Sequence, residues 1–211
     1  MIKILLFLMS IFIISEVLYL VEANASDMSI CADNAVWDRK EEVTTLTGNV
    51  LITKGSMTIS STKMKVIGKL DTLDEVIGEG KVVVIDKGKN IYLSGGYMKY
   101  SKPDEYILMT ISPKLELKNE DVVITSMKME GFYKKNEFVA TDSVKIIAKD
   151  TVATASKAIY SDDKKRLELS GNPQVLQDEN KLAGGKIIYY LNEDRFEVIE
   201  GVKAILMRSR E

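Results

Sequence analysis

The 211-residue sequence predicts an all-β fold made of stacked repeats of about 30 residues. Apolar residues recur at every second position rather than every third or fourth, which is the period of a strand. Val, Ile, Thr and Tyr dominate these stretches, and they suit a pleated surface. A turn-forming residue returns at intervals of 32, 33, 29, 29 and 30 residues. A repeat of this length cannot bury its apolar face alone, so we expect it to stack on its neighbours.

Residues 1–25 are predicted to be a secretory signal peptide. Lys3 precedes an apolar run over residues 4–14, and Ala23 and Ala25 supply the small residues that cleavage before Ser26 requires. An uncleaved membrane anchor is the alternative, because residues 4–21 just reach the length that spans a bilayer. Cleavage would leave residues 26–211, in which no change of composition marks a second domain. We therefore expect a single domain over that range.

The composition argues against several kinds of function. With 29 basic and 31 acidic residues, the chain has no basic excess for binding nucleic acid. It has no histidine, and its single cysteine, Cys31, forms neither an intrachain disulfide nor a cysteine-based metal cluster. A β-helical enzyme acting on polysaccharide would need facing carboxylates, and the aligned positions hold only scattered Lys, Glu and Ser. We therefore expect no catalytic residues, no metal and no cofactor.

Each predicted repeat opens on a corner residue that favours a turn: Gly48, Gly80, Pro113, Asp142, Gly171 and Gly201. Apolar residues follow at the second and fourth positions after the corner in the first four copies. The fifth copy keeps the pattern with Pro173 and Val175, and the sixth departs from it at Lys203. The regular phase predicts that these apolar residues share one inward face.

A second strand follows a polar turn in each of the first five copies, and a third stretch follows the second strand. An intervening bend would shift the alternation, so the sequence leaves the inward face of the third stretch unassigned. The first and second strands together predict an apolar lining. On alternation alone it is either a closed core or an accessible groove. Its predicted members are Val50, Ile52, Ile59, Val82, Val84, Leu93, Leu115, Leu117, Ile124, Val144, Ile146 and Val175.

Two stretches of sequence resemble OstA-like domains, the family of LptA, LptC and the N-terminal domain of LptD. They are Leu46-Thr47-Gly48-Asn49 and Leu169-Ser170-Gly171-Asn172, each leading into an alternating strand and a polar turn, and the resemblance covers roughly residues 34–207. It implies an open β-jellyroll whose interior holds the lipid A acyl chains of lipopolysaccharide, without catalytic residues or a cofactor. Pro113 and Asp142 depart from the glycine that the family places at the corner.

The resemblance implies a lipopolysaccharide carrier or bridge in the periplasm of a two-membrane bacterium. Its implied partners are inner-membrane LptC-like and outer-membrane LptD-like OstA domains. The alternatives are a membrane-anchored LptC-like component, and a closed β-solenoid scaffold or adhesin that binds no lipid. Residues 47–53 and 202–207 lack strong guards against strand pairing, so we also expect head-to-tail self-association through edge strands.

Overall fold

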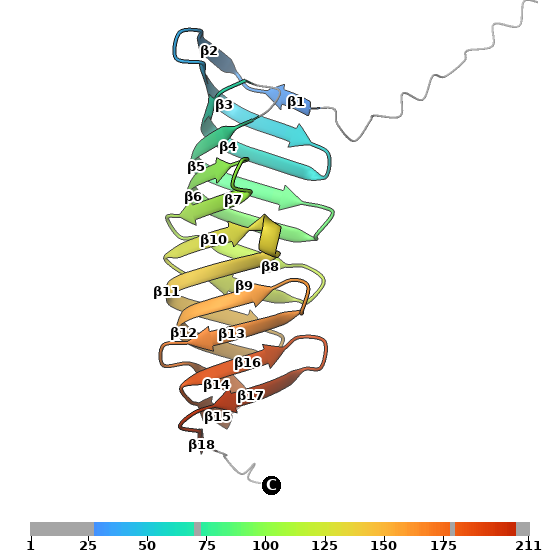
Figure 1. The fold of residues 1–211 in the computed structure, drawn as a ribbon, viewed down its shortest axis with the longest axis vertical. Helices are drawn as coiled ribbons and strands as arrows, with labels where there is room; N and C mark the ends of the chain where they lie inside the picture. The colour runs from blue at the N-terminus through green and yellow to red at the C-terminus, as the bar shows by residue number, and fades with distance from the viewer. Residues whose placement is uncertain (1–27, 70–72, 178–179, 206–211) are drawn as a thin grey trace, which may run out of the picture.

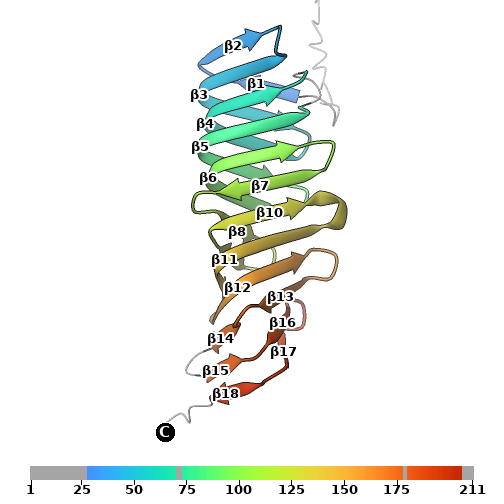
Figure 2. The same ribbon diagram turned by 60° about the vertical axis from the view of Figure 1, so that its left-hand side comes forward.

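The computed structural model describes residues 28–69, 73–177 and 180–205. The predicted signal peptide at 1–25 lies outside these residues. In the described ranges, eighteen strands form one continuous antiparallel ladder, drawn out into an elongated stack with β2 near one end and β18 at the other (Figure 1). Figure 2 shows the strands crossing the long axis as successive rungs. The all-β, stacked-repeat architecture predicted from the sequence is confirmed. Within the described residues, no helix is long and apolar enough to cross a membrane.

The strands vary in length from three to twelve residues, and one short 3-10 helix, η1 (Tyr133–Lys135), interrupts them. In chain order they are β1 (Met28–Cys31), β2 (Asn34–Asp38), β3 (Val43–Lys54), β4 (Met57–Ile67), β5 (Glu75–Asp86), β6 (Ile91–Ser101), β7 (Tyr106–Thr110), β8 (Lys114–Leu117), β9 (Val122–Thr125), β10 (Lys128–Phe132), β11 (Glu137–Ala148), β12 (Thr151–Ser161), β13 (Arg166–Ser170), β14 (Gln174–Gln177), β15 (Asn180–Ala183), β16 (Lys186–Tyr190), β17 (Arg195–Ile199) and β18 (Lys203–Ile205).

The ladder is folded along its length into two facing sheets. Six long strands (β3, β4, β5, β6, β11 and β12) bend near their middle and contribute one half to each sheet. The first sheet is completed by β2, β7, β10, β13, β16 and β17. The second is completed by β1, β8, β9, β14, β15 and β18. The buried side chains of both sheets meet in one core cluster between them.

Pairs of consecutive residues with positive φ form the bends within β3, β5 and β11. They also form the bends between β7 and β8, between β13 and β14, and between β17 and β18. At the first bend φ is 76° for Gly48 and 46° for Asn49. Glycine suits the first position because a Cβ there would lie 2.2 Å from Asp33 Oδ2. The six pairs are Gly48 and Asn49, Gly80 and Lys81, Ile111 and Ser112, Asp142 and Ser143, Gly171 and Asn172, and Glu200 and Gly201. Five of the six predicted corners therefore take this left-handed conformation.

The third corner was predicted at Pro113, and this prediction is wrong because the bend begins two residues earlier, at Ile111. The positive-φ pair is Ile111 and Ser112, and Pro113 follows it as a buried residue. The proline ring holds φ near −65°, so proline cannot occupy the left-handed position itself. The other departure from glycine, Asp142, leaves strand pairing intact, because β11 continues through the bend with only a register shift between Thr141 and Val144.

The end strands differ from the expectation at the N-terminal end. Residues 47–53 were predicted to be an open edge, but β3 is paired with β4 on one side and with β1 and β2 on the other. The edge that remains is formed by β1 and β2 instead. At the opposite end, the stack finishes on β17 and β18.

Candidate functional site

The space between the two sheets is a continuous apolar interior. All twelve residues predicted to line it are at most 3% exposed and belong to one core cluster. These twelve come from the second sheet, where the strand after each bend alternates inward and outward. Val144 and Ile146, for example, are buried, while Lys145 between them is exposed.

The first sheet contributes the other half of the interior, which the sequence analysis left unassigned. Its fully buried members include Met64, Met98, Met109, Met129, Tyr160 and Leu167. The alternation was readable in short strands such as β7, where Ile107 and Met109 are buried and their neighbours are not. Four of these six side chains are methionines, which adapt to irregular shapes.

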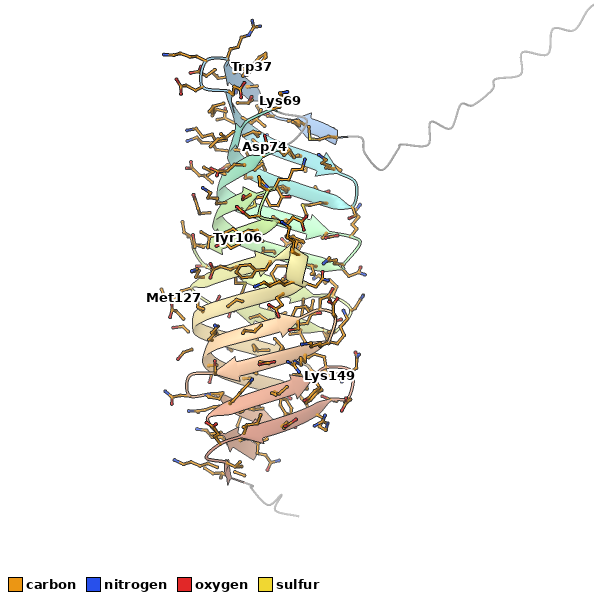
Figure 3. All side chains as sticks on the ribbon, viewed as in Figure 1. Trp37, Lys69, Asp74, Tyr106, Met127 and Lys149 are labelled. Carbon is orange, nitrogen blue, oxygen red and sulfur yellow. The ribbon has the colours of Figure 1, made fainter. Side chains whose placement is uncertain are left out.

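The edge of the stack opposite the bends is lined by hairpin turns from both sheets, and we call the line between them the seam. Turns of the first sheet lie at residues 102–105, 133–136, 162–165 and 191–194, and turns of the second lie at 55–56, 87–90, 118–121 and 149–150. Figure 3 shows Met127, which lies at a bend, and Lys149, which lies in a seam turn, on opposite sides of the stack.

Among the described residues, the contacts of Lys89 with Asn136, Lys165 with Glu120 and Lys149 with Asp194 join the two sheets across the seam. Lys89 Nζ donates to Asn136 Oδ1, Lys165 Nζ lies 2.8 Å from Glu120 Oε1, and Lys149 Nζ lies 3.1 Å from Asp194 Oδ2. Of the two ion pairs, Lys165 with Glu120 is the less exposed, since the Glu120 side chain is only 11% accessible to solvent. A shielded pair is screened less than an exposed one, so this contact is expected to be the stronger of the two ion pairs.

Three tyrosines of the first sheet contact polar groups of the seam turns. Tyr160 Oη donates to Asp162 Oδ1 over 2.8 Å, and Tyr189 Oη donates to Asp194 Oδ1 over 2.6 Å. Burial, and then the hydrogen bond to the carboxylate, raises the pKa of both hydroxyls above the ordinary value. The third, Tyr133, lies 5.5 Å from Lys89 Nζ, measured to the ring centre, and burial raises its pKa also. All three therefore stay neutral near pH 7.

Asp162 and Lys165 form the most connected part of the seam. Lys165 Nζ lies 2.6 Å from Asp162 Oδ1 as well as close to Glu120. Burial disfavours the charged form of both groups. For Asp162, the hydrogen bonds from Lys165 and Tyr160 outweigh burial and hold its pKa below the ordinary value. For Lys165, the bonds to Asp162 and Glu120 outweigh burial and raise its pKa.

The seam has a pocket of about 280 Å³ near its N-terminal end. Ile52 and Ile59, both members of the core, form part of its lining, and Lys54 and Lys102 add two cations. The remaining lining residues are Ser56, Met57, Leu73 and Tyr100, so both sheets contribute. A second pocket, of about 340 Å³, includes Gln174, Lys181 and Lys203 and lies away from the seam, on the outer side of β14, β15 and β18.

The described residues contain no cluster of three His, Cys, Asp or Glu side chains placed to hold a metal ion. The fold and its interior define an elongated β-repeat protein with an apolar space between two sheets and strands left open at its ends. The sequence profile of a family described as "LptA/(LptD N-terminal domain) LPS transport protein" matches residues 29–137 and 114–195, which together cover more than half of the chain. The chain belongs to this family, whose members are transport proteins and not enzymes.

The two matched ranges overlap, as expected for a chain whose repeats align with the profile in more than one register. Among solved structures, one described as LptH, the LptA homologous periplasmic component of the lipopolysaccharide transport device from Pseudomonas aeruginosa, is 14% identical. The match covers 86% of this chain and 96% of that one with a TM-score of 0.27, and the family assignment rests on the profile alone. No curated protein matches the chain.

Proposed function

We propose that this chain is a periplasmic lipopolysaccharide carrier that holds lipid A acyl chains between its two sheets. The observation that carries the proposal is the uninterrupted apolar interior, together with a surface pocket at the N-terminal end of the seam whose lining includes two core residues. Removing one CH₂ group from water contributes about 0.8 kcal/mol, so part of one acyl chain already supplies useful affinity. Residues 1–25 would be removed during export, leaving residues 26–211 as one domain.

The open ends suit the role of a bridge between two membranes. A partner strand added to β2 or β18 would satisfy backbone groups that no strand of this chain pairs in the described residues. The proposed partners are further copies of this chain, an LptC-like domain at the inner membrane and an LptD-like domain at the outer membrane. If residues 1–25 are kept as an anchor, the same fold would serve as the LptC-like component.

A closed scaffold that binds no lipid is the second candidate. It is favoured by the burial of all twelve lining residues, because a core this dry is already satisfied by its own side chains. The carrier is expected to copurify with lipid, and the closed scaffold is not.

The deciding experiment is purification from the periplasm of a two-membrane bacterium, followed by mass spectrometry of extracted lipid. A photo-crosslinking residue at Leu117, which faces inward, should capture lipopolysaccharide, and the same residue at Glu116, its outward neighbour on β8, should not. The crosslinking variants are compared only if their thermal unfolding matches that of the parent. Absence of lipid from the purified protein and from both crosslinking positions would favour the closed scaffold.

A further inference from the structure

The seam is not uniform along the stack. Its N-terminal end has the pocket whose lining includes the core residues Ile52 and Ile59. From Lys89 onward, each successive pair of turns is joined by a polar contact between the sheets: Lys89 with Asn136, Glu120 with Lys165, and Lys149 with Asp194. The pocket and these three contacts therefore lie along the same edge of the stack.

Two of these contacts are ion pairs, and they differ in what they connect from the ion pairs that lie within one sheet. Lys63 and Glu79, for example, lie 3.1 Å apart on β4 and β5, which are neighbours within the first sheet and already hydrogen-bonded. The pair of Lys149 and Asp194 has the same 3.1 Å separation and similar exposure, but it joins turns of different sheets. In the described residues, no backbone hydrogen bond joins the two sheets along this edge, so side chains alone close it.

We propose that the three cross-seam contacts form a latch that regulates access to the interior, so that an acyl chain entering at the N-terminal pocket advances only as the contacts open in turn. This inference rests on the proposed function and adds to it a place of entry and an order of opening. The cation Lys102 suits an amphiphile whose head group is anionic, with its apolar tail directed toward Ile52 and Ile59.

The latch accounts for a dry core in a protein that takes up lipid. The bend edge keeps its backbone pairing whether the seam is open or closed, because neighbouring strands remain paired along each sheet. Along the seam itself, opening separates charged and hydrogen-bonded side chains that water can solvate. Lys165 keeps Asp162 as a partner when Glu120 moves away, so the middle contact opens without leaving an isolated buried cation.

The test measures the rate at which an anthroyloxy-labelled palmitate enters the protein purified from the periplasm and delipidated, followed by stopped-flow fluorescence. Lys149→Met and Glu120→Gln remove one side of two latch contacts. Each should speed uptake about two- to fivefold, and the double variant more than either alone. The matched control is Lys63→Met, which breaks an ion pair of the same length and exposure within one sheet and should leave the rate unchanged.

Two further measurements separate the latch from a general loosening of the fold. Raising the salt concentration to about 1 M should speed uptake by the parent protein, because salt screens exposed pairs, and should have less effect on the double variant. Met57→Trp places a larger side chain in the pocket and should slow uptake in every background. Thermal unfolding is recorded for each variant, and circular dichroism confirms the strand content.

The outcomes distinguish the latch from the function on which it rests. Uptake by the parent with unchanged rates in the seam variants would overturn the latch and leave the carrier function standing. Equal acceleration by Lys63→Met would overturn it as well, since the effect would then not belong to the seam. Uptake unaffected by Met57→Trp would overturn the pocket as the place of entry. A parent protein that takes up neither the probe nor lipopolysaccharide would remove the carrier function and the latch together.

Discussion

Lys165 and Glu120 lie 2.8 Å apart, although Lys165 belongs to a turn of the first sheet and Glu120 to a turn of the second. Asp162, which accepts a hydrogen bond from Tyr160, holds the same lysine from within the first sheet. The ammonium group is therefore shared between one carboxylate that stays with it and one that connects it to the facing sheet. This arrangement makes the middle of the seam responsive to charge, and it leads to the first prediction.

Acid should destabilise the fold through Asp162. Because the pKa of Asp162 is held below 3.8 in the folded protein, the unfolded chain binds this proton more readily. The stabilisation is therefore present above about pH 4 and is lost as the pH falls through the folded-state pKa. Asp162→Asn should lower stability at neutral pH and flatten the decline between about pH 5 and pH 2, measured by urea unfolding. Parallel pH profiles for the parent and the variant would contradict this role.

Two neighbouring isoleucines on β11 should differ sharply in what they contribute to stability. Ile146 faces the interior at 2% exposure, and Ile147 faces outward at 42%. Ile146→Ala removes buried methyl and methylene groups and should lower the free energy of unfolding by about 2–5 kcal/mol. Ile147→Ala makes the same chemical change on the outer face and should cost about 0.5 kcal/mol or less. Urea unfolding of both variants gives the comparison, and equal losses would contradict the assignment of the faces.

The alternation that distinguishes these two residues was visible in the sequence, because a strand with one wet and one buried face carries a period of two. The same alternation could not predict which residues face inward after a bend. In β4 the buried positions include Ile59 and Ser61 before the bend and Met64 and Val66 after it, so the inward positions change from odd to even. The register shift between Ser60 and Lys63 causes this change, and only its geometry fixes the second face.

The seam was beyond sequence reasoning for a different reason. Glu120 and Lys165 lie in polar turns of separate repeats, where a charge is ordinarily solvated and carries no information about a partner. A weaker signal was present in the first-sheet turns, where Tyr160 precedes Asp162 and Tyr189 precedes Asp194. In both cases the tyrosine lies near the end of a strand and the aspartate lies in the following turn. In the structure the tyrosine hydroxyl donates a hydrogen bond to that aspartate.

The corner glycines should differ in their tolerance of alanine. Gly171 and Gly201 both have positive φ, 73° and 61°, so a Cβ at either position costs about 1 kcal/mol in backbone strain. At Gly171 the added Cβ would also lie 2.6 Å from Ser156 Cβ, whereas nothing lies within 4 Å of it at Gly201. Gly171→Ala should therefore be less stable than Gly201→Ala by about 1 kcal/mol or more. Thermal and urea unfolding check the order, and a reversed order would show that the bend relaxes at little cost.

The ends of the stack should mediate concentration-dependent association. At the N-terminal end, β2 exposes Val36 and Trp37 at 68% and 62%, and Trp37 lies at that end in Figure 3. At the other end β18 exposes Ile205 at 57%, and within the described part of the chain it pairs only with β15. Strands of this kind accept a partner strand, and joining unlike ends gives a head-to-tail contact that need not close.

Val36→Lys places a charge on the free edge and should weaken this association, as should deletion of residues 200–211. Leu176→Lys is the matched control, because Leu176 is 47% exposed on the outer face of β14, a strand paired on both sides with β12 and β15. Light scattering over a wide concentration range should show a mass that grows for the parent and for Leu176→Lys and stays near the monomer for the two edge variants. A monomer at every concentration would rule out bridging by end-to-end stacking. A closed dimer that neither edge change affects would do the same, because its contact would then lie on a face of the stack rather than at its ends.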